Sequence, residues 1–380
     1  MEPYHRTLQK LVEKQLYKEK VIIIYGARRT GKTTLCKTIL ANAAEKGKKT
    51  KYLNCELLSV NQELSTSNEI VLKNYLGNLD LVVLDEAQHI ENIGLVLKIL
   101  VDTYPEIQVI ATGSSSFDLA NKTGEPLTGR ARKFILYPLS IQELHSQYDQ
   151  FQLNSYLDKI LRFGLYPSVF QASEEDAPME LEEIASNYLY KDILSFEKVK
   201  SSETLSQLLQ LLALQLGNEV SYNEIGTQLG LDSATVKRYI DLLEKCFVVF
   251  KLRSLNRNPR NEIKKGRKIY FYDLGIRNSL IRNYNHLKLR NDEGALWENF
   301  CIIERMKYNQ TQNRLVNSYF WRNINKQEVD YIEEADGEMK GFEFKFSPHT
   351  KMRSTKTFLE NYTPSTIQRV DQSNYLSFLM

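Results

Sequence analysis

A run of eight residues near the N-terminus, GARRTGKT at 26–33, carries the glycines, lysine and threonine that phosphate chemistry needs. Glycine permits a tight turn whose backbone N–H groups can face inward and donate to phosphate oxygens. Lys32 can reach the β- and γ-phosphates of a nucleoside triphosphate, and the Thr33 hydroxyl can ligate Mg²⁺. The spacing therefore predicts a phosphate-binding loop, with ATP and Mg²⁺ as cofactors. The residues expected to contact the nucleotide are Gly26, Ala27, Arg28, Arg29, Thr30, Gly31, Lys32, Thr33 and Thr34.

Two adjacent acids end a second apolar run, in LVVLDEAQ at 81–88. Asp85 is expected to hold the metal ion, directly or through water. Glu86 is placed to orient or deprotonate an attacking water, which favours hydrolysis of ATP over transfer of its phosphate to a metabolite. The two acids could instead cap the helix that follows, a role that needs no nucleotide.

Arg130 precedes another apolar run, in LTGRARKFILYPLS, and Gly129 would let it project. An arginine suits the charge that develops on a transferred phosphoryl group, and it is often supplied across a subunit interface. This role for Arg130 would imply a homo-oligomer. A plain surface arginine is the alternative.

Strands and helices that alternate over the first 140 residues must position these side chains. VIIIY at 21–25 is a β-branched run, as in a strand buried on both faces. The other expected strands are 51–55, 81–85, 107–113 and 133–137, and the helical patterns between them lie at 32–46, 66–77 and 92–103. The alternation predicts an α/β fold with a parallel sheet covered on both sides.

After this core at 1–140, three further domains are predicted: a helical lid or linker at 141–202, a winged helix at 203–285 and an α/β domain at 286–380. The winged helix is predicted from 221–252, which has the order helix, turn, helix, strand. Asp232 or Ser233 can cap the second helix. The buried face of that helix is expected to consist of Val236, Tyr239, Ile240 and Leu243. In DNA-binding proteins of this kind, outward polar residues of the second helix touch bases or phosphates.

Basic residues cluster just beyond this helix. Between Lys251 and Lys268 there are eight basic residues and one acid, Glu262, which makes +7 locally in a chain of net charge +3. Such clustering is typical of a wing that contacts DNA phosphates. A solvated loop, or a winged helix that packs between protein domains, is the alternative. The residues expected to contact DNA are Thr235, Lys237, Arg238, Arg257, Arg260, Lys264, Lys265 and Arg267.

A third group of charged residues lies in the C-terminal α/β domain. Glu298 falls on a predicted helix, Asp330 on a strand, and Glu343 with Lys345 on the next strand. This layout resembles the PD-(D/E)XK nucleases, in which Asp330 and Glu343 would gather Mg²⁺ and the lysine would polarise water. Cross-strand pairing on an exposed face is the ordinary alternative, and such a fold can persist without cleavage activity.

Composition places the chain in a class of protein. Its 380 residues include 50 basic and 47 acidic side chains, so total charge does not decide between nucleic acid and other partners. Four cysteines lie far apart, without metal-ligand spacing, which fits a reducing cytoplasm. No apolar run approaches 18 residues, so we expect a soluble protein that does not enter the membrane.

Together these residues resemble a widespread group of bacterial and archaeal AAA-type ATPases whose C-terminal half is a domain of unknown function. The resemblance covers almost the whole chain and is carried by GARRTGKTTL, LDEAQ, TGSSS, TGRARKFILYPLS, FYDLGIRNSL, WENF, EVDYI and FEFKFS. It implies a P-loop NTPase core with an AAA-like parallel sheet, then a winged helix and a nuclease-like domain. It also implies that Ser114, or Ser115 as second choice, bonds the attacking water or the γ-phosphate; a serine-rich turn that caps the next helix is the alternative.

Three functions compete at this point. The first is an ATP-hydrolysing, DNA-binding protein that acts as an oligomeric motor or a nucleotide-switched clamp. The second is a signalling or protein-remodelling ATPase whose C-terminal domains bind a protein. A kinase of a small metabolite is the weakest, because it needs an acceptor pocket in place of a basic winged helix.

Overall fold

The computed structural model describes residues 4–114, 127–186, 202–255, 266–323, 325, 327–351 and 355–380. The chain divides into two compact units, Met1–Pro138 and Leu139–Met380. The boundary lies close to residue 140, where the predicted ATPase core ends.

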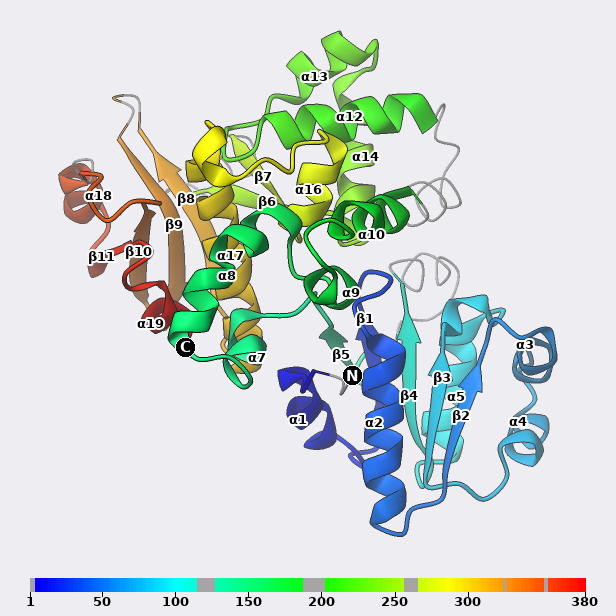
Figure 1. Ribbon diagram of the computed structural model, residues 1–380. Coiled ribbons are helices and arrows are strands. Elements are labelled where there is room, and N and C mark those ends of the chain that lie inside the picture. The colour runs from blue at the N-terminus through cyan, green and yellow to red at the C-terminus, as the bar shows by residue number, and fades with distance from the viewer. Residues whose placement is uncertain are drawn as a thin grey trace. The chain divides into compact units, whose positions relative to one another are not determined.

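The first unit is built on a parallel β-sheet (Figure 1). The described strands have the order β2-β3-β4-β1-β5, and each pairing is parallel. Because the strands run in one direction, the residues that follow β1, β3 and β4 meet at the same edge of the sheet. The strand bounds are β1 Val21–Tyr25, β2 Thr50–Asn54, β3 Leu81–Asp85, β4 Gln108–Gly113 and β5 Ala131–Ile135.

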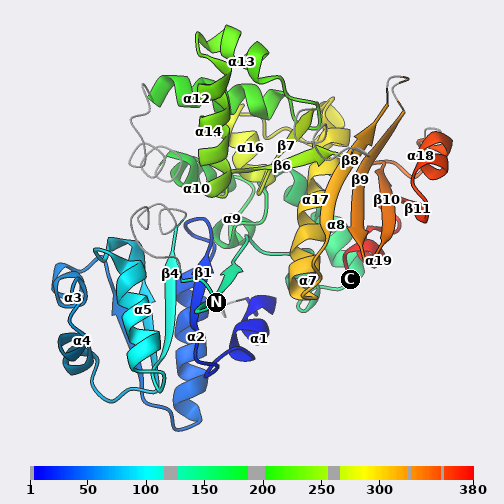
Figure 2. The same ribbon diagram turned by 180° about the vertical axis from the view of Figure 1, so that it is seen from behind.

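Helices cover both faces of this sheet. The helices α1 and α2 pack on one face through a core that includes Leu8, Ile22, Leu35 and Ile110. The helix α5 lies on the opposite face, as the two views show (Figures 1 and 2). The helix bounds are α1 Thr7–Glu13, α2 Lys32–Glu45, α3 Leu58–Leu64, α4 Glu69–Leu76, η1 Ala87–His89 and α5 Ile93–Thr103.

The predicted α/β core is confirmed. The strands expected at 21–25 and 81–85 have the predicted bounds, and the other three lie within two residues of theirs. The helices α1 and α3 were not predicted. Each has seven residues, which is too short for a helical period to stand out in the sequence.

The second unit begins with helices, as the sequence predicts for 141–202. The side chain of Asp232 caps α14 by accepting from the N–H of Thr235 at 2.8 Å, and the four predicted inward residues of this helix are buried. The bounds are α7 Ile141–His145, α8 Gln150–Phe163, α9 Pro167–Gln171, α10 Ala177–Ile184, α12 Ser202–Leu214, α13 Tyr222–Leu229, α14 Ser233–Lys245, α16 Leu274–Leu280, η3 Leu287–Leu289, α17 Glu293–Thr311, α18 Lys356–Asn361 and α19 Tyr375–Leu379.

The second unit also contains a mixed sheet, whose described strands have the order β11-β10-β9-β8-β6-β7. The hairpin β6–β7, in the predicted winged helix, pairs through β6 with β8 of the predicted C-terminal domain. This pairing connects the predicted winged helix at 203–285 with the predicted domain at 286–380, and it has no local signal in the sequence. The bounds are β6 Val249–Ser254, β7 Arg267–Phe271, β8 Asn317–Arg322, β9 Glu328–Ala335, β10 Glu338–Phe344 and β11 Ser365–Val370.

The motif FYDLGIRNSL forms a buried contact between α16 and the end of α8 in the second unit. The Asp273 carboxylate caps α16, accepts from the N–H of Leu165 at 2.7 Å, and leaves no room for a side chain at Gly164. A Cβ on Gly275 would lie 2.0 Å from the carbonyl oxygen of Phe163, so only glycine permits this approach of α16 to α8. The motif is thus explained by packing of this unit.

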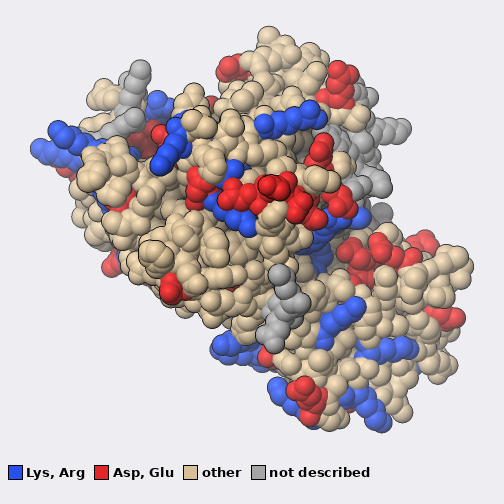
Figure 3. Space-filling model, viewed as in Figure 1, with Lys and Arg blue, Asp and Glu red and all other residues tan. Residues whose placement is uncertain are grey.

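Charge of both signs is interspersed over the face drawn in Figure 3, where acidic side chains gather across the middle of the second unit. Three consecutive acids of the second unit, Glu174, Glu175 and Asp176, are exposed. Among the described helices, none is long and apolar enough to span a bilayer.

Candidate functional site

The phosphate-binding loop connects the end of β1 at Tyr25 to the start of α2 at Lys32. A Cβ on Gly26 would lie 2.3 Å from the carbonyl oxygen of Leu136, so glycine is required for this close approach. Gly31 adopts a left-handed conformation with φ of 96°. The buried Lys32 ammonium donates to the carbonyl oxygens of Gly26 at 2.9 Å and Ala27 at 3.0 Å, which holds it over the loop.

Asp85 lies at the centre of a hydrogen-bonded cluster at the same sheet edge. Its Oδ2 accepts from the hydroxyl of Thr33 at 2.7 Å and from the hydroxyl of Tyr52 at 2.5 Å, while its Oδ1 accepts from Thr112. The strand order explains the cluster, because β3 lies between β2, which carries Tyr52, and β4, which carries Thr112. Asp85 is therefore tied to Thr33 of the loop, as the predicted metal site requires.

Tyr52 and Thr112 are site residues that the sequence did not reveal. Burial raises the pKa of Tyr52, and the hydrogen bond to Asp85 raises it further, so the phenol stays protonated and donates a hydrogen bond to the carboxylate. The available signal was weak. Each is a hydroxyl-bearing residue within a strand, and only the pairing of these strands with β3 brings it to Asp85.

Removal of the Tyr52 hydroxyl is expected to weaken metal binding at Asp85. Partners that orient a ligand typically contribute 10- to 100-fold to metal affinity, and we expect roughly the lower figure for Tyr52→Phe because this side chain is half-buried. The measurement is the Mg²⁺ concentration that half-saturates ATP hydrolysis. Tyr75→Phe, a tyrosine of the same unit away from Asp85, is the control. Equal Mg²⁺ dependence in the two variants would contradict this role.

Glu86 has a left-handed backbone conformation, with φ of 53°, immediately beyond β3. Its N–H donates to the Thr112 hydroxyl at 3.0 Å, and its carboxylate accepts from the Gln88 amide at 2.5 Å. A non-glycine residue in this region costs of order 1–3 kcal/mol, and such strain concentrates at functional sites. The bend separates the two acids, so that Asp85 is bound into the cluster and Glu86 is oriented by Gln88.

Arg6 also contacts the loop. Its guanidinium donates to the carbonyl oxygens of Thr30 at 2.6 Å and Tyr137 at 2.7 Å, and the side chain is buried. This arginine connects the N-terminal segment to the loop and places a positive charge beside the phosphate site. It could not be predicted, because it precedes a short helix 24 residues before Thr30.

Ser114 is buried one residue beyond β4, close in sequence to Thr112, and its predicted role on the γ-phosphate stays a prediction. Ser115 lies outside the described residues. The other nucleotide contacts predicted in the loop, Arg28, Arg29 and Thr34, lie on the turn or in the first turn of α2, and their contacts with ATP stay predictions as well.

Arg130 lies at the opposite edge of the same sheet. Its carbonyl oxygen accepts at 2.9 Å from the N–H of Val21, the first residue of β1, whereas the phosphate-binding loop follows the last, Tyr25. Its guanidinium Nε donates to Asp102 at 2.6 Å. Within its own unit Arg130 therefore lies at the end of the strands opposite to the phosphate-binding loop. A role on phosphates would require a second copy of the chain.

The residues predicted to contact DNA have different surroundings in the second unit. Lys237 and Arg238 are exposed on α14, while Thr235 donates to the capping carboxylate of Asp232 at 2.8 Å. Arg267 lies on β7 with its guanidinium 4.6 Å from the ring centroid of Tyr222. Four more of the predicted residues lie outside the described part of the chain: Arg257, Arg260, Lys264 and Lys265.

Lysines separate the acids predicted to form a nuclease-like centre. Lys345 Nζ lies 3.6 Å from a carboxylate oxygen of both Asp330 and Glu343. Glu298 is engaged elsewhere, because it accepts from the buried Lys268 at 2.9 Å and from the Tyr270 hydroxyl. Burial raises the pKa of Glu298, and the charge of Asp330 adds to the shift while Lys268 opposes it. Among the described residues, no group of three or more His, Cys, Asp or Glu side chains has metal-binding geometry.

One detail of this centre corrects the predicted strand pattern. The strand β10 ends at Phe344, so Lys345 follows the strand instead of lying on it. Glu343 is 1% exposed and does not stand on an open face. The helices α17 and α19 pack against this strand, and its last four residues are buried.

Three family models match successive parts of the chain. A model described as an AAA domain matches residues 18–145, which include all five strands of the first sheet and the phosphate-binding loop. Residues 154–288 match a domain of unknown function (DUF8612), and residues 293–375 match another (DUF4143). The first unit is thus an α/β P-loop fold of the AAA type.

Curated relatives share most of the chain. An uncharacterized protein of Mycobacterium tuberculosis is 28% identical over 338 residues, which are 88% of this chain and 72% of the relative. An uncharacterized protein of Methanocaldococcus jannaschii is 28% identical over 301 residues, covering 69% of this chain and 63% of its own.

Solved structures overlap part of the chain with low TM-scores. DnaA from Aquifex aeolicus bound to AMPPCP has a TM-score of 0.28 and 19% identity, covering 63% of this chain and 86% of its own. Drosophila ORC bound to DNA has a TM-score of 0.25 and 13% identity, covering 74% and 95%. TM-scores this low support no inference about a ligand or a partner of this chain.

Proposed function

We propose that this protein hydrolyses ATP with Mg²⁺ in its first unit and uses the reaction to act on DNA through its second. The observation that supports ATP hydrolysis most strongly is the cluster at Asp85, which ties the loop residue Thr33 to the end of β3 at 2.7 Å. A phosphate-binding loop alone would serve a binding protein as well as an enzyme. The adjoining Glu86, whose carboxylate is bound by Gln88 and not by the cluster, adds the base that hydrolysis needs.

The residues of the cluster fit Mg²⁺. A hydroxyl from Thr33 and a carboxylate from Asp85 are oxygen donors of the kind this ion prefers, and they already lie within hydrogen-bond distance of each other. These two residues would hold the ion. When bound, Mg²⁺ neutralises the charge that develops on the β- and γ-phosphate oxygens.

The protein side chains have separate tasks in the reaction. Lys32 exchanges its contacts with the loop carbonyls for phosphate oxygens and so binds the triphosphate. Glu86 orients a water and takes its proton as the water oxygen attacks the γ-phosphorus. The bond from that phosphorus to the β–γ bridging oxygen breaks, and ADP and inorganic phosphate leave. Arg130 of a second subunit would stabilise the charge on the transferred group, which makes a homo-oligomer part of the proposal.

The proposed action on DNA rests on the second unit. The exposed Lys237 and Arg238 of α14, followed by the basic hairpin, have the order of a winged helix whose second helix and wing contact DNA. We do not extend the proposal to DNA cleavage. Lys345 lies 3.6 Å from both Asp330 and Glu343, and Lys268 pairs with Glu298 and Glu328, so each of these acids already has a lysine partner within the protein.

Phosphate release from Mg·ATP, measured with single-stranded, duplex and branched DNA and with none, tests this function. We expect hydrolysis that DNA stimulates, together with an oligomer in solution at the same protein concentration. Hydrolysis that no DNA form alters would remove DNA from the proposal. Capture of one protein partner that survives nuclease treatment would then favour a protein-remodelling ATPase.

A further inference from the structure

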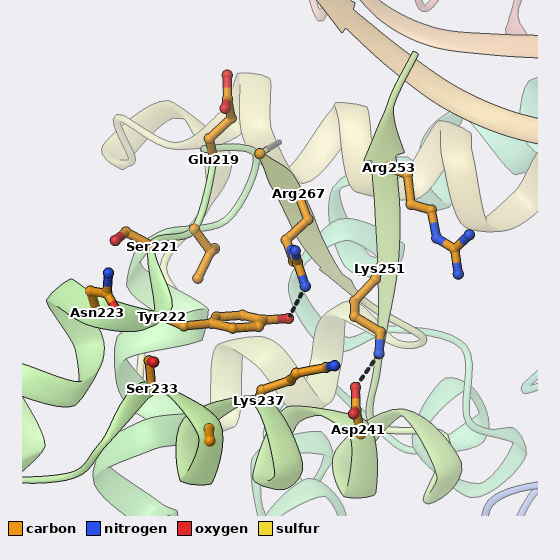
Figure 4. Close-up of a pocket in the computed structure, with 13 residues that line it drawn as sticks. Glu219, Ser221, Tyr222, Asn223, Ser233, Lys237, Asp241, Lys251, Arg253 and Arg267 are labelled. Atoms are coloured by element: carbon orange, nitrogen blue, oxygen red, sulfur yellow. Dashed lines mark hydrogen bonds and ion pairs between the residues drawn. The ribbon is translucent and has the colours of Figure 1, made fainter. Parts of the chain in front are cut away.

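A pocket of about 930 Å³ opens in the second unit between α14, the hairpin β6–β7 and the segment that begins α13 (Figure 4). Its volume is at the upper end of the range for small-ligand sites. Basic side chains from three elements line it: Lys237 of α14, Lys251 and Arg253 of β6, and Arg267 of β7. In Figure 4 the ends of Lys237, Lys251 and Arg267 approach the Tyr222 hydroxyl from separate elements.

The acids that line this pocket are already paired. Asp241 forms an ion pair of 2.5 Å with Lys251, and Glu219 lies 3.5 Å from Arg322. Within the described part of the chain, Lys237 and Arg253 form no ion pair. Positive charge is therefore in excess at the pocket, although the whole chain is close to neutral.

Two arginines of the pocket lie directly opposite each other. Arg253 and Arg267 are paired in the antiparallel register of β6 and β7, and like charges at opposed positions destabilise a sheet. In Figure 4 their guanidinium groups point apart, that of Arg267 toward Tyr222 and that of Arg253 away from it, so each can contact a different oxygen of an extended anion. The hairpin is thus formed in a way that suits a negatively charged ligand.

Tyr222 orients Arg267 and contributes a donor of its own. The guanidinium stacks 4.6 Å from the ring centroid and donates to the hydroxyl oxygen at 3.2 Å. Burial raises the pKa of Tyr222, so the phenol stays protonated. Because the oxygen accepts from Arg267, the phenol proton is directed toward another acceptor, and an oxygen in the pocket is suited to receive it.

We propose that this pocket binds phosphate groups through Lys237, Arg253 and Arg267, with the Tyr222 hydroxyl as a further donor. The phosphates belong either to a nucleic-acid strand, in which case the inference rests on the proposed function, or to a free nucleotide. Arginine pairs and stacked guanidinium groups are the usual means of binding phosphate oxygens. The pocket is separate from the ATP site, which lies in the first unit.

The first arm of the test measures binding of fluorescein-labelled single-stranded and duplex 20-mers by anisotropy across salt concentrations. In Lys237→Gln/Arg253→Gln, affinity for the single strand is expected to fall at least about 10-fold at 0.1 M salt. The slope of log K against log salt should fall by about 1.4, at about 0.7 for each lost contact. The matched control is Lys245→Gln/Lys288→Gln, which removes two exposed cations of the same unit that do not line the pocket.

The second arm titrates pyrophosphate by calorimetry while a non-hydrolysable ATP analogue saturates the first unit. Saturable binding that the pocket variant loses, with oligonucleotide binding unchanged, supports a free nucleotide as the source. Asp241→Asn, which leaves Lys251 less neutralised, is expected to tighten whichever ligand binds. A variant that simply failed to fold would not show this increase in affinity.

Two outcomes overturn the inference: pocket and control variants that bind both probes alike, or a wild-type protein that binds neither. These failures are distinct from failure of the proposed function. If the pocket variant keeps full stimulation of ATP hydrolysis by DNA, then DNA binds elsewhere and the proposed function remains. If pyrophosphate binds in the pocket while no DNA stimulates hydrolysis, the inference remains and the proposed action on DNA fails.

Discussion

Replacement of Glu86 with glutamine is expected to slow ATP hydrolysis by roughly 10²- to 10⁴-fold, the contribution typical of a positioned general base. The amide has the same size as the carboxylate, so the strained bend at Glu86 and the contact with Gln88 should persist. ATP should still bind, because the loop and the cluster at Asp85 are untouched. The measurements are phosphate release under saturating Mg·ATP and direct binding of a labelled ATP analogue.

Two control variants are compared with Glu86→Gln. Glu91→Gln removes an exposed carboxylate of the same unit and should hydrolyse ATP at the wild-type rate. Lys32→Ala should lose nucleotide binding itself, since it removes the ammonium that the loop surrounds. If Glu86→Gln retains turnover within about threefold of wild type, Glu86 is not the base.

Asp292→Ala is expected to destabilise the second unit by about 3–5 kcal/mol, because it leaves two buried arginines without their carboxylate. Asp292 accepts from Arg277 at 2.5 Å and twice from Arg290 at 2.8 Å, and both arginine side chains are almost fully buried. Asn278 joins the same network through its side-chain oxygen and donates to the carbonyl oxygens of Leu161 and Arg162 on α8. The network thus ties α8, α16 and the start of α17.

The charge state of Asp292 sets the pH range in which this contribution exists. Burial alone would raise its pKa, but the hydrogen bonds and charges of Arg290 and Arg277 outweigh burial and lower the pKa to about 2. A lowered pKa in the folded state means that the stabilisation is complete above the ordinary value of 3.8 and is lost as pH falls toward 2. At neutral pH the full effect should therefore be measurable.

Tryptophan fluorescence during urea unfolding measures the stability of the second unit, and so the destabilisation expected for Asp292→Ala. The chain has two tryptophans, Trp297 and Trp321, and both are buried in the second unit. Glu338→Ala, which removes an exposed acid of β10, should change the free energy of unfolding by less than about 0.5 kcal/mol. A midpoint for Asp292→Ala equal to that of Glu338→Ala would show that the network is not a source of stability.

Local sequence was sufficient to place the residues of the contiguous motifs on their strands, turns and helices. A β-branched strand, a glycine turn and a helix follow one another over 21–45, so the position of Lys32 and Thr33 depends on neighbours along the chain. The acids Asp85 and Glu86 end the strand β3, which has the predicted bounds. Periodicity likewise predicted the buried face of α14.

Only the folded chain brings the remaining residues to their partners. Tyr52 and Thr112 reach Asp85 because β2 and β4 flank β3, and that strand order depends on packing between segments far apart in the chain. The sheet also places Arg130 at the edge away from its own loop. The pairing of β6 with β8 unites segments predicted as separate domains. Local spacing reflects the geometry of a single strand or helix, whereas strand order and burial are set by the free energy of the whole core.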